Sequence, residues 1–193
     1  MTAPVIERWA DGGGAGGDAP RVLVLPGSRY PAHRPGLAWP IRALELQGWQ
    51  VWCAAWELAR DATREECQVT VDAAVQRFLD VTGSQPQLVL AKSVATLAAQ
   101  WVAEQHVPAV WTTPLLHDDE CVANLARSSA PGLLVAGSRD HTWDDAAARR
   151  TGKEILVVPG ADHGWQTGGW HTELGAVGEV TAAVADFAAR VRP

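Results

Sequence analysis

Three side chains that can act together in nucleophilic catalysis each stand shortly after an apolar run of the chain. They are Ser93, Asp140 and His163, in that order along the sequence. A serine hydroxyl becomes an effective nucleophile when a histidine accepts its proton and a carboxylate orients that histidine. The carboxyl ends of parallel strands meet at one edge of a sheet, so side chains that follow such strands can converge there. The spacing therefore makes these three residues candidates for one catalytic site.

The serine lies in "LVLAKSVATL" (88–97), a stretch that also invites a nucleotide-binding interpretation. A phosphate-binding loop has the pattern G-x-x-x-x-G-K-[ST], because backbone N–H groups wrap the phosphates in conformations that a Cβ resists. With Lys92 and Ser93 as its last two residues, the two required glycines fall at Pro86 and Ala91. Both positions fail, which argues against phosphate binding here.

The same stretch fits a nucleophile elbow better, although it departs from the usual pattern. An elbow has the pattern G-x-S-x-G, since a sharp strand-to-helix turn needs small residues on both sides of the serine. Here Ala91 and Ala95 replace the two glycines. Alanine is the next smallest residue, and we expect it to permit the turn. Lys92 occupies the variable position, where we expect it to be solvated or to line the cleft.

Composition excludes several classes of protein. The net charge of −6 argues against a protein that binds a phosphate backbone, so we expect no nucleic-acid partner. No apolar run reaches the roughly 18 residues of a membrane span. The three cysteines, Cys53, Cys67 and Cys121, form neither a disulfide framework nor a metal-binding pattern, and we expect a cytoplasmic protein.

Apolar runs and helix-period segments alternate along the chain. The apolar runs predict seven strands, at 5–9, 21–27, 49–56, 87–91, 108–114, 132–138 and 154–160. Helical spacing of apolar residues predicts helices at 37–48, 71–82, 94–102, 118–129, 143–152 and 177–191. Strands that are apolar throughout are buried on both faces. We therefore predict one α/β domain over residues 1–193, with a doubly wound, mostly parallel sheet of about six to seven strands. Residues 1–20 would supply an N-terminal strand and a glycine-rich connector.

With these motifs in place, the sequence resembles the α/β-hydrolase superfamily, and in particular its small, lidless serine hydrolases related to dienelactone hydrolase. The resemblance covers about residues 20–190 and rests on "VLVLPGS", "LVLAKSVA", "LLVAGSRDHTWD" and "VVPGADHGW". It implies an α/β-hydrolase fold without a cap domain, because about one helix fits between the fifth and sixth predicted strands.

The resemblance also implies roles for the candidate residues. Ser93 would be the nucleophile, His163 the general base and Asp140 the carboxylate that orients it. The oxyanion hole would use the backbone N–H groups of Val94 and Ser28, with Arg29 as the alternative to Ser28. Three other carboxylates remain rivals to Asp140, namely Asp144, Asp145 and Asp162; the first two look more like residues of a first helical turn.

Substrate contacts must come from the loops around the site. We expect Arg29, Trp143 and Trp165 to contact the substrate. The alternative for Arg29 is a solvated loop residue that makes no substrate contact. An arginine can bind a carboxylate with two parallel hydrogen bonds. The segment "HDDE" (117–120) lacks metal-ligand spacing, so we expect no metal, and no cofactor is predicted.

These observations predict a serine hydrolase that cleaves a carboxylic ester or thioester of small size through an acyl-enzyme. Two alternatives stay open. A protein that keeps the fold without the chemistry would account for the alanines of the elbow. Acyl transfer or cyclisation would use the same three residues with a substrate nucleophile in place of water. We expect no membrane association, and the sequence does not indicate an oligomeric state.

Overall fold

The structure is a computed structural model that describes residues 3–9 and 18–193. Its seven strands form one sheet with the order β1-β3-β2-β4-β5-β6-β7. The strands are β1 (Val5–Arg8), β2 (Arg21–Leu25), β3 (Gln50–Ala55), β4 (Leu88–Lys92), β5 (Ala109–Thr112), β6 (Gly132–Gly137) and β7 (Glu154–Val158). All neighbours pair in parallel except β1, which is antiparallel to β3. The predicted mostly parallel sheet is confirmed, while the glycine-rich connector falls largely outside the described residues.

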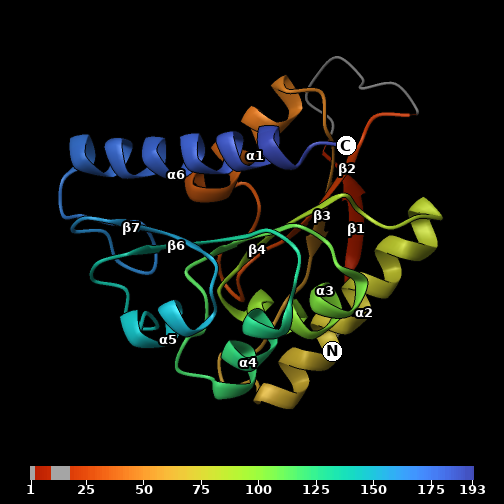
Figure 1. Cartoon of the computed structure of the whole chain (residues 1–193), viewed down its shortest axis with the longest axis horizontal. Helices are drawn as coiled ribbons and strands as arrows, with labels where there is room; N and C mark the ends of the chain where they lie inside the picture. Colours follow the sequence, from red (N-terminus) through yellow and green to blue (C-terminus); the bar gives the residue numbers. More distant parts are fainter. Residues whose placement is uncertain (1–2, 10–17) are drawn as a thin grey trace.

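Helices cover both faces of the sheet. They are α1 (Pro35–Leu46), α2 (Arg64–Thr82), the short 3₁₀ helix η1 (Ser93–Ala98), α3 (Ala99–Gln105), α4 (Asp119–Arg127), α5 (Asp145–Arg150) and α6 (Trp170–Val191). Helices α1 and α6 lie together on one face, and α2 to α5 lie on the other (Figure 1). The apolar residues accordingly form two buried clusters, one on each side of the sheet. This three-layer arrangement is the predicted doubly wound α/β fold.

Helix α2 begins earlier than its apolar periodicity indicates. The apolar spacing starts at Val71, whereas the helix starts at Arg64. Thr63 and Glu66 form a capping box, in which the Thr63 hydroxyl accepts from the N–H of Glu66 and the Glu66 carboxylate accepts from the N–H of Thr63. These bonds satisfy orphan donors of the first turn, so a polar segment can begin the helix before any residue is buried.

The segment after β4 differs from the single helix predicted at 94–102. It begins as η1 and continues as α3 from Ala99. The Thr96 hydroxyl donates to the backbone carbonyl of Ser93 at 2.6 Å, and its oxygen accepts from the N–H of Leu115 at 3.1 Å. A side chain bonded three residues back tightens the turn, which favours 3₁₀ geometry at this point. The irregular start of the helix is thus tied to the position of the serine.

Candidate active site

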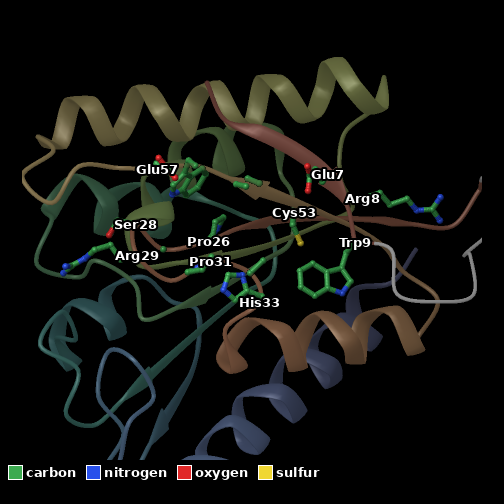
Figure 2. A pocket seen from close by; sticks show the side chains of 15 residues that line it. Glu7, Arg8, Trp9, Pro26, Ser28, Arg29, Pro31, His33, Cys53 and Glu57 are labelled. Atoms are coloured by element: carbon green, nitrogen blue, oxygen red, sulfur yellow. The ribbon is translucent and has the colours of Figure 1, made fainter. Parts of the chain in front are cut away.

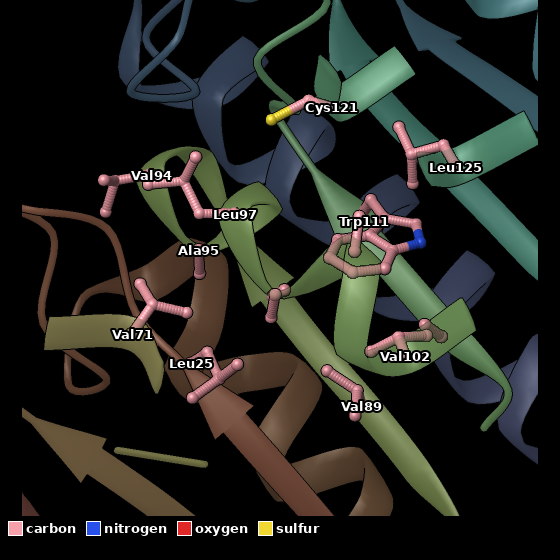
Figure 3. Packing of buried hydrophobic residues seen from close by; sticks show 14 of the residues in the cluster. Leu25, Val71, Val89, Val94, Ala95, Leu97, Val102, Trp111, Cys121 and Leu125 are labelled. Carbon is pink, nitrogen blue, oxygen red and sulfur yellow. The ribbon is translucent and has the colours of Figure 1, made fainter. Parts of the chain in front are cut away.

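Ser93 occupies a strained turn between β4 and η1. Its φ is 54°, a left-handed conformation that costs energy for a residue with a Cβ. The flanking residues Ala91 and Ala95 are 1% and 0% exposed, so both methyl groups are packed inside the protein. Figure 3 shows Ala95 in the apolar cluster that also contains Val71 and Leu25. Two alanines therefore accommodate the turn that usually has two glycines.

The three candidate residues form one continuous hydrogen-bonded chain. The Ser93 Oγ lies 2.8 Å from Nε2 of His163, and Nδ1 of the same imidazole lies 2.8 Å from Oδ1 of Asp140. Each residue comes from a different loop at the carboxyl edge of the sheet, after β4, β6 and β7. The imidazole is thus placed to take a proton from the serine on one side while the carboxylate fixes its other nitrogen.

Asp140 is held by more donors than the imidazole alone. Its side chain is fully buried, and Oδ1 also accepts from the backbone N–H and the hydroxyl of Thr142, both at 2.9 Å. Burial raises the pKa of Asp140, but the hydrogen bonds from His163 and Thr142 outweigh burial and hold that pKa below its usual range. The carboxylate is therefore charged at neutral pH. Thr142 is a contributor to the site that the sequence pattern did not reveal.

The three rival carboxylates have other partners. Asp144 caps α5 by accepting from the N–H of Ala147 at 2.7 Å. Asp145 accepts from the indole N–H of Trp143 at 2.7 Å. Asp162 accepts from two backbone N–H groups of its own loop, each at 2.8 Å. Of the four carboxylates, Asp140 is the one within hydrogen-bonding distance of the imidazole.

The loop that carries the histidine packs tightly against the end of β6. A Cβ at Gly137 would lie 2.0 Å from the backbone oxygen of Ala161, and this oxygen already accepts from the N–H of Arg139 at 2.9 Å. The absence of a side chain at Gly137 thus lets the loops that bear Asp140 and His163 approach each other.

We expect Gly137→Ala to destabilise the protein by about 1–3 kcal/mol and to lower the ester hydrolysis that the sequence predicts, because backbone atoms must move to admit the methyl group. Thermal unfolding and ester hydrolysis would measure the two effects. The control is Gly175→Ala in α6, where an added Cβ meets nothing within 4 Å. This change should stabilise the protein slightly, by roughly 0.5–1 kcal/mol, as expected for alanine in a helix. Equal stability of the two variants would contradict the tight packing at Gly137.

The loop after β2 lies beside the elbow. Gly27 and Tyr30 pair through two backbone hydrogen bonds of 3.2 and 3.4 Å, so Ser28 stands in a short turn between them. A Cβ built on Gly27 would lie 3.7 Å from the Cβ of Ser93, which shows how close this loop comes to the serine. The N–H of Val94 belongs to the first turn of η1, where N–H groups lack acceptors within the helix.

The structure contradicts the prediction that Lys92 is solvated or lines the cleft, because the residue is 1% exposed. Its Nζ donates to the Thr113 hydroxyl at 2.7 Å and to the backbone oxygen of His163 at 2.8 Å. Alternation along β4 turns Lys92 away from the apolar cluster that contains Ala91, toward the opposite side of the strand, where the loop after β7 covers it.

Residues expected to contact the substrate lie in different environments. Arg29 is exposed and borders two cavities of 640 Å³ each. Figure 2 shows Arg29 and Ser28 at one end of the first cavity and Trp9 at the other. Trp143 is partly buried and packs against the core. Trp165 is 1% exposed, and it is one of the residues that line the second cavity.

One group of potential metal ligands occurs in the described part of the chain. It consists of Asp140, His141 and His163, whose ligand atoms all lie within 4.8 Å of one another. Two of these residues are already engaged with each other through Nδ1 and Oδ1, as in a serine-histidine-aspartate site. His141 is exposed, and its ring lies 4.9 Å from that of His163. The cluster is therefore accounted for without a metal. Among the described residues, no helix has the length and apolarity needed to span a membrane.

Comparisons with known proteins identify the fold. Neither a family model nor a curated protein matches the sequence. Among solved structures, Est1E from Butyrivibrio proteoclasticus with bound ferulic acid is 12% identical and covers 97% of this chain and 94% of its own, with a TM-score of 0.71. XC6422 from Xanthomonas campestris, described as an α/β serine hydrolase without a lid, is 13% identical and covers 98% and 89%, with a TM-score of 0.65. An α/β serine hydrolase homologue from Coxiella burnetii is 14% identical and covers 95% and 89%, with a TM-score of 0.67.

The protein has the α/β-hydrolase fold, as these likenesses and the sheet topology show. One short helix, α4, lies between β5 and β6, so no cap domain is inserted between these two strands. The structural neighbours are serine hydrolases and esterases, and a serine, a histidine and an aspartate meet here at the carboxyl edge of the sheet. The resemblance that the sequence indicated is confirmed at the level of the fold.

Proposed function

We propose that this protein is a serine hydrolase that cleaves a small carboxylic ester or thioester through an acyl-enzyme formed on Ser93. The observation that carries the proposal is the unbroken chain from Ser93 Oγ through His163 to Asp140, with 2.8 Å at both steps. A serine in a left-handed turn, aligned with a histidine whose far nitrogen faces a buried carboxylate, is the arrangement that activates a hydroxyl.

The proposed reaction has two halves. In the first, Oγ attacks the substrate carbonyl, the proton passes to Nε2 of His163, and the imidazolium then protonates the departing alkoxide or thiolate. In the second, water gives a proton to Nε2 and attacks the acyl-enzyme, and the proton returns to Oγ as the carboxylic acid leaves. The charge of Asp140 stabilises the imidazolium in both halves. No cofactor enters this scheme.

We assign the oxyanion hole to the backbone N–H groups of Val94 and Ser28. Both belong to segments next to the serine, and donors of this kind stabilise the negative oxygen of the tetrahedral intermediate. The N–H of Ser28 makes no hydrogen bond within the described residues, which leaves it available. Both N–H groups are parts of the backbone, so every substitution except proline leaves them in place.

Ser28→Pro tests this assignment because proline removes the N–H. We expect kcat to fall by about 10²–10³-fold, the usual loss for one oxyanion donor. Ser28→Ala is the matched control, since it keeps the N–H, and its kcat should stay near that of the wild type. Steady-state ester hydrolysis gives both values, and circular dichroism checks that the proline variant is folded. A folded Ser28→Pro enzyme with normal kcat would exclude Ser28 from the oxyanion hole.

For substrate binding we propose that Arg29 and Trp143 flank the reacting group. Arg29 lines both cavities, so it can bind a carboxylate or another acidic substituent of a substrate that occupies either of them. Only α4 lies between β5 and β6, so a small acyl substrate can reach the serine without a lid inserted there having to open.

The test of the proposed function is reaction of the folded wild-type protein with a fluorophosphonate probe, followed by a panel of p-nitrophenyl esters and acyl thioesters. We expect stoichiometric labelling and turnover of short esters. Mass spectrometry of the products, with an alcohol or amine acceptor added, separates hydrolysis from acyl transfer. A folded protein that takes up no probe would exclude the enzyme and leave a binding protein with this fold.

A further inference from the structure

The residue directly before the nucleophile has a buried amino group that the proposed reaction does not use. Lys92 is the last residue of β4 and is among the largest fully buried side chains of the protein. Burying an amino group is costly unless acceptors replace the lost water. Burial lowers the pKa of Lys92 to about 7, while the charges of Asp140 and Asp162 act in the opposite direction. The free-energy cost of burying the Lys92 amino group must therefore be offset by its contacts.

The amino group of Lys92 contacts three different loops. Nζ donates to the Thr113 hydroxyl after β5 and to the backbone oxygen of His163 after β7. It also lies 4.6 Å from the ring centre of Tyr30 and 5.4 Å from that of Trp165, within the range of cation–π interactions. One side chain on β4 therefore touches the loops that follow β2, β5 and β7.

The bond to His163 is the informative one, because it reaches the backbone of the residue that carries the imidazole. The ring of His163 is held by Asp140 on one side and faces Ser93 on the other. The backbone oxygen of the same residue accepts a hydrogen bond from Lys92, which precedes Ser93 in the chain. The elbow and the base are thus connected twice, once through the reacting atoms and once through this lysine.

We propose that Lys92 is a positioning residue that fixes the loop of His163 relative to Ser93. Misplacement of reacting groups by about 1 Å can cost about 10²-fold in rate. The loop after β7 is closed by its own hydrogen bonds, from the N–H groups of Gly164 and Gln166 to Asp162, which fix its internal shape but not its distance from Ser93. A direct bond from the strand that ends at the nucleophile supplies this constraint. The inference rests on the proposed function.

The test is Lys92→Met, which keeps an unbranched side chain as far as the ε position and removes the amino group with both of its hydrogen bonds. We expect kcat for a p-nitrophenyl ester to fall by about 10²-fold, with KM changed by less than about threefold, since the contact acts on the reacting geometry. The rate of fluorophosphonate labelling should fall in parallel. The one-dimensional proton NMR signal of the hydrogen between Asp140 and His163, assigned by its loss in Asp140→Ala, should broaden or disappear.

Lys153→Met is the matched control for a general loss of stability. Lys153 precedes β7, at the amino ends of the parallel strands, and its Nζ likewise donates to two acceptors, the backbone oxygens of Ser128 and Ala130. Its removal should lower the melting temperature but leave kcat and the NMR signal unchanged. Folded Lys92→Met with normal kcat and a normal signal would overturn the positioning role. A wild-type protein that takes up no probe would instead overturn the proposed function.

Discussion

Ser93→Ala is expected to abolish fluorophosphonate labelling and to lower kcat for ester hydrolysis by about 10⁶-fold, the scale seen when a triad serine is removed. The alanine has no oxygen to attack the carbonyl, so the acyl-enzyme cannot form. The protein should stay folded, because Ser93 is only partly buried and its Oγ contacts the imidazole rather than the core. Gel fluorescence measures the labelling, and the ester assay with intact-mass analysis measures acyl-enzyme formation.

The chain has a second serine-histidine contact that serves as an internal control. The Ser129 Oγ lies 2.9 Å from Nδ1 of His106, on the exposed surface before β6. Among the described residues, no carboxylate forms a hydrogen bond or ion pair with this histidine, and Ser129 does not follow a strand in a left-handed turn. Ser129→Ala should therefore label and turn over like the wild type. Equal labelling of Ser93→Ala and wild type would place the reactive nucleophile elsewhere.

The elbow shows what could be predicted from the sequence and why. The strands could be predicted from the apolar runs, because parallel strands buried on both faces are apolar throughout. The candidate residues follow three of those runs, so they were predicted to lie at the same edge of the sheet. The missing glycines raised the question of whether the turn could form. In the structure Ser93 adopts a φ of 54° with Ala91 and Ala95 packed on either side, so small size was the physical requirement.

Other features of the site lay beyond the sequence because they depend on contacts between distant segments. Nothing in "AKSVA" indicates that Lys92 turns inward, since the acceptors that make its burial possible lie 21 and 71 residues further along the chain. Thr142 was equally hidden, although a hydroxyl two residues after an aspartate is a common local partner for it. Trp165, for which we predict a substrate contact, lines the second cavity but is 1% exposed, because its indole fills the space against Gly36 of α1.

Asp140→Ala is expected to lower kcat by about 10⁴-fold, close to the loss recorded for removal of a triad aspartate. Without the carboxylate, Nδ1 of His163 keeps only the longer contact of 3.3 Å with the Thr142 hydroxyl, and the negative charge that stabilises the imidazolium during attack by Ser93 is lost. The same variant leaves the two donors of Thr142 without their acceptor. Single-turnover kinetics with a p-nitrophenyl ester would give the loss in the acylation step. A near-normal rate would show that a carboxylate other than Asp140 orients His163.

Asp140→Asn separates the charge of the residue from its hydrogen bonds. All three donors converge on Oδ1, and Oδ2 is buried without a partner among the described residues. An asparagine can place its carbonyl oxygen at the Oδ1 position and keep the bonds from Thr142 and from Nδ1 of His163. Nε2 then remains free to accept the proton of Ser93, and the loss is confined to the missing charge.

We therefore expect a smaller loss for Asp140→Asn than for Asp140→Ala, about 10²–10³-fold, which is the scale of one electrostatic contribution. The amide nitrogen would take the place of Oδ2 and lack an acceptor, which should lower stability by about 1–3 kcal/mol. Denaturant unfolding measures this cost. Equal losses of kcat in the two variants would mean that the amide turns its N–H₂ group toward His163. The imidazole would then carry its proton on Nε2, where it blocks Ser93. The orientation of the amide in Asp140→Asn thus decides whether its loss of kcat comes from the wrong tautomer of His163 or from the missing negative charge of Asp140.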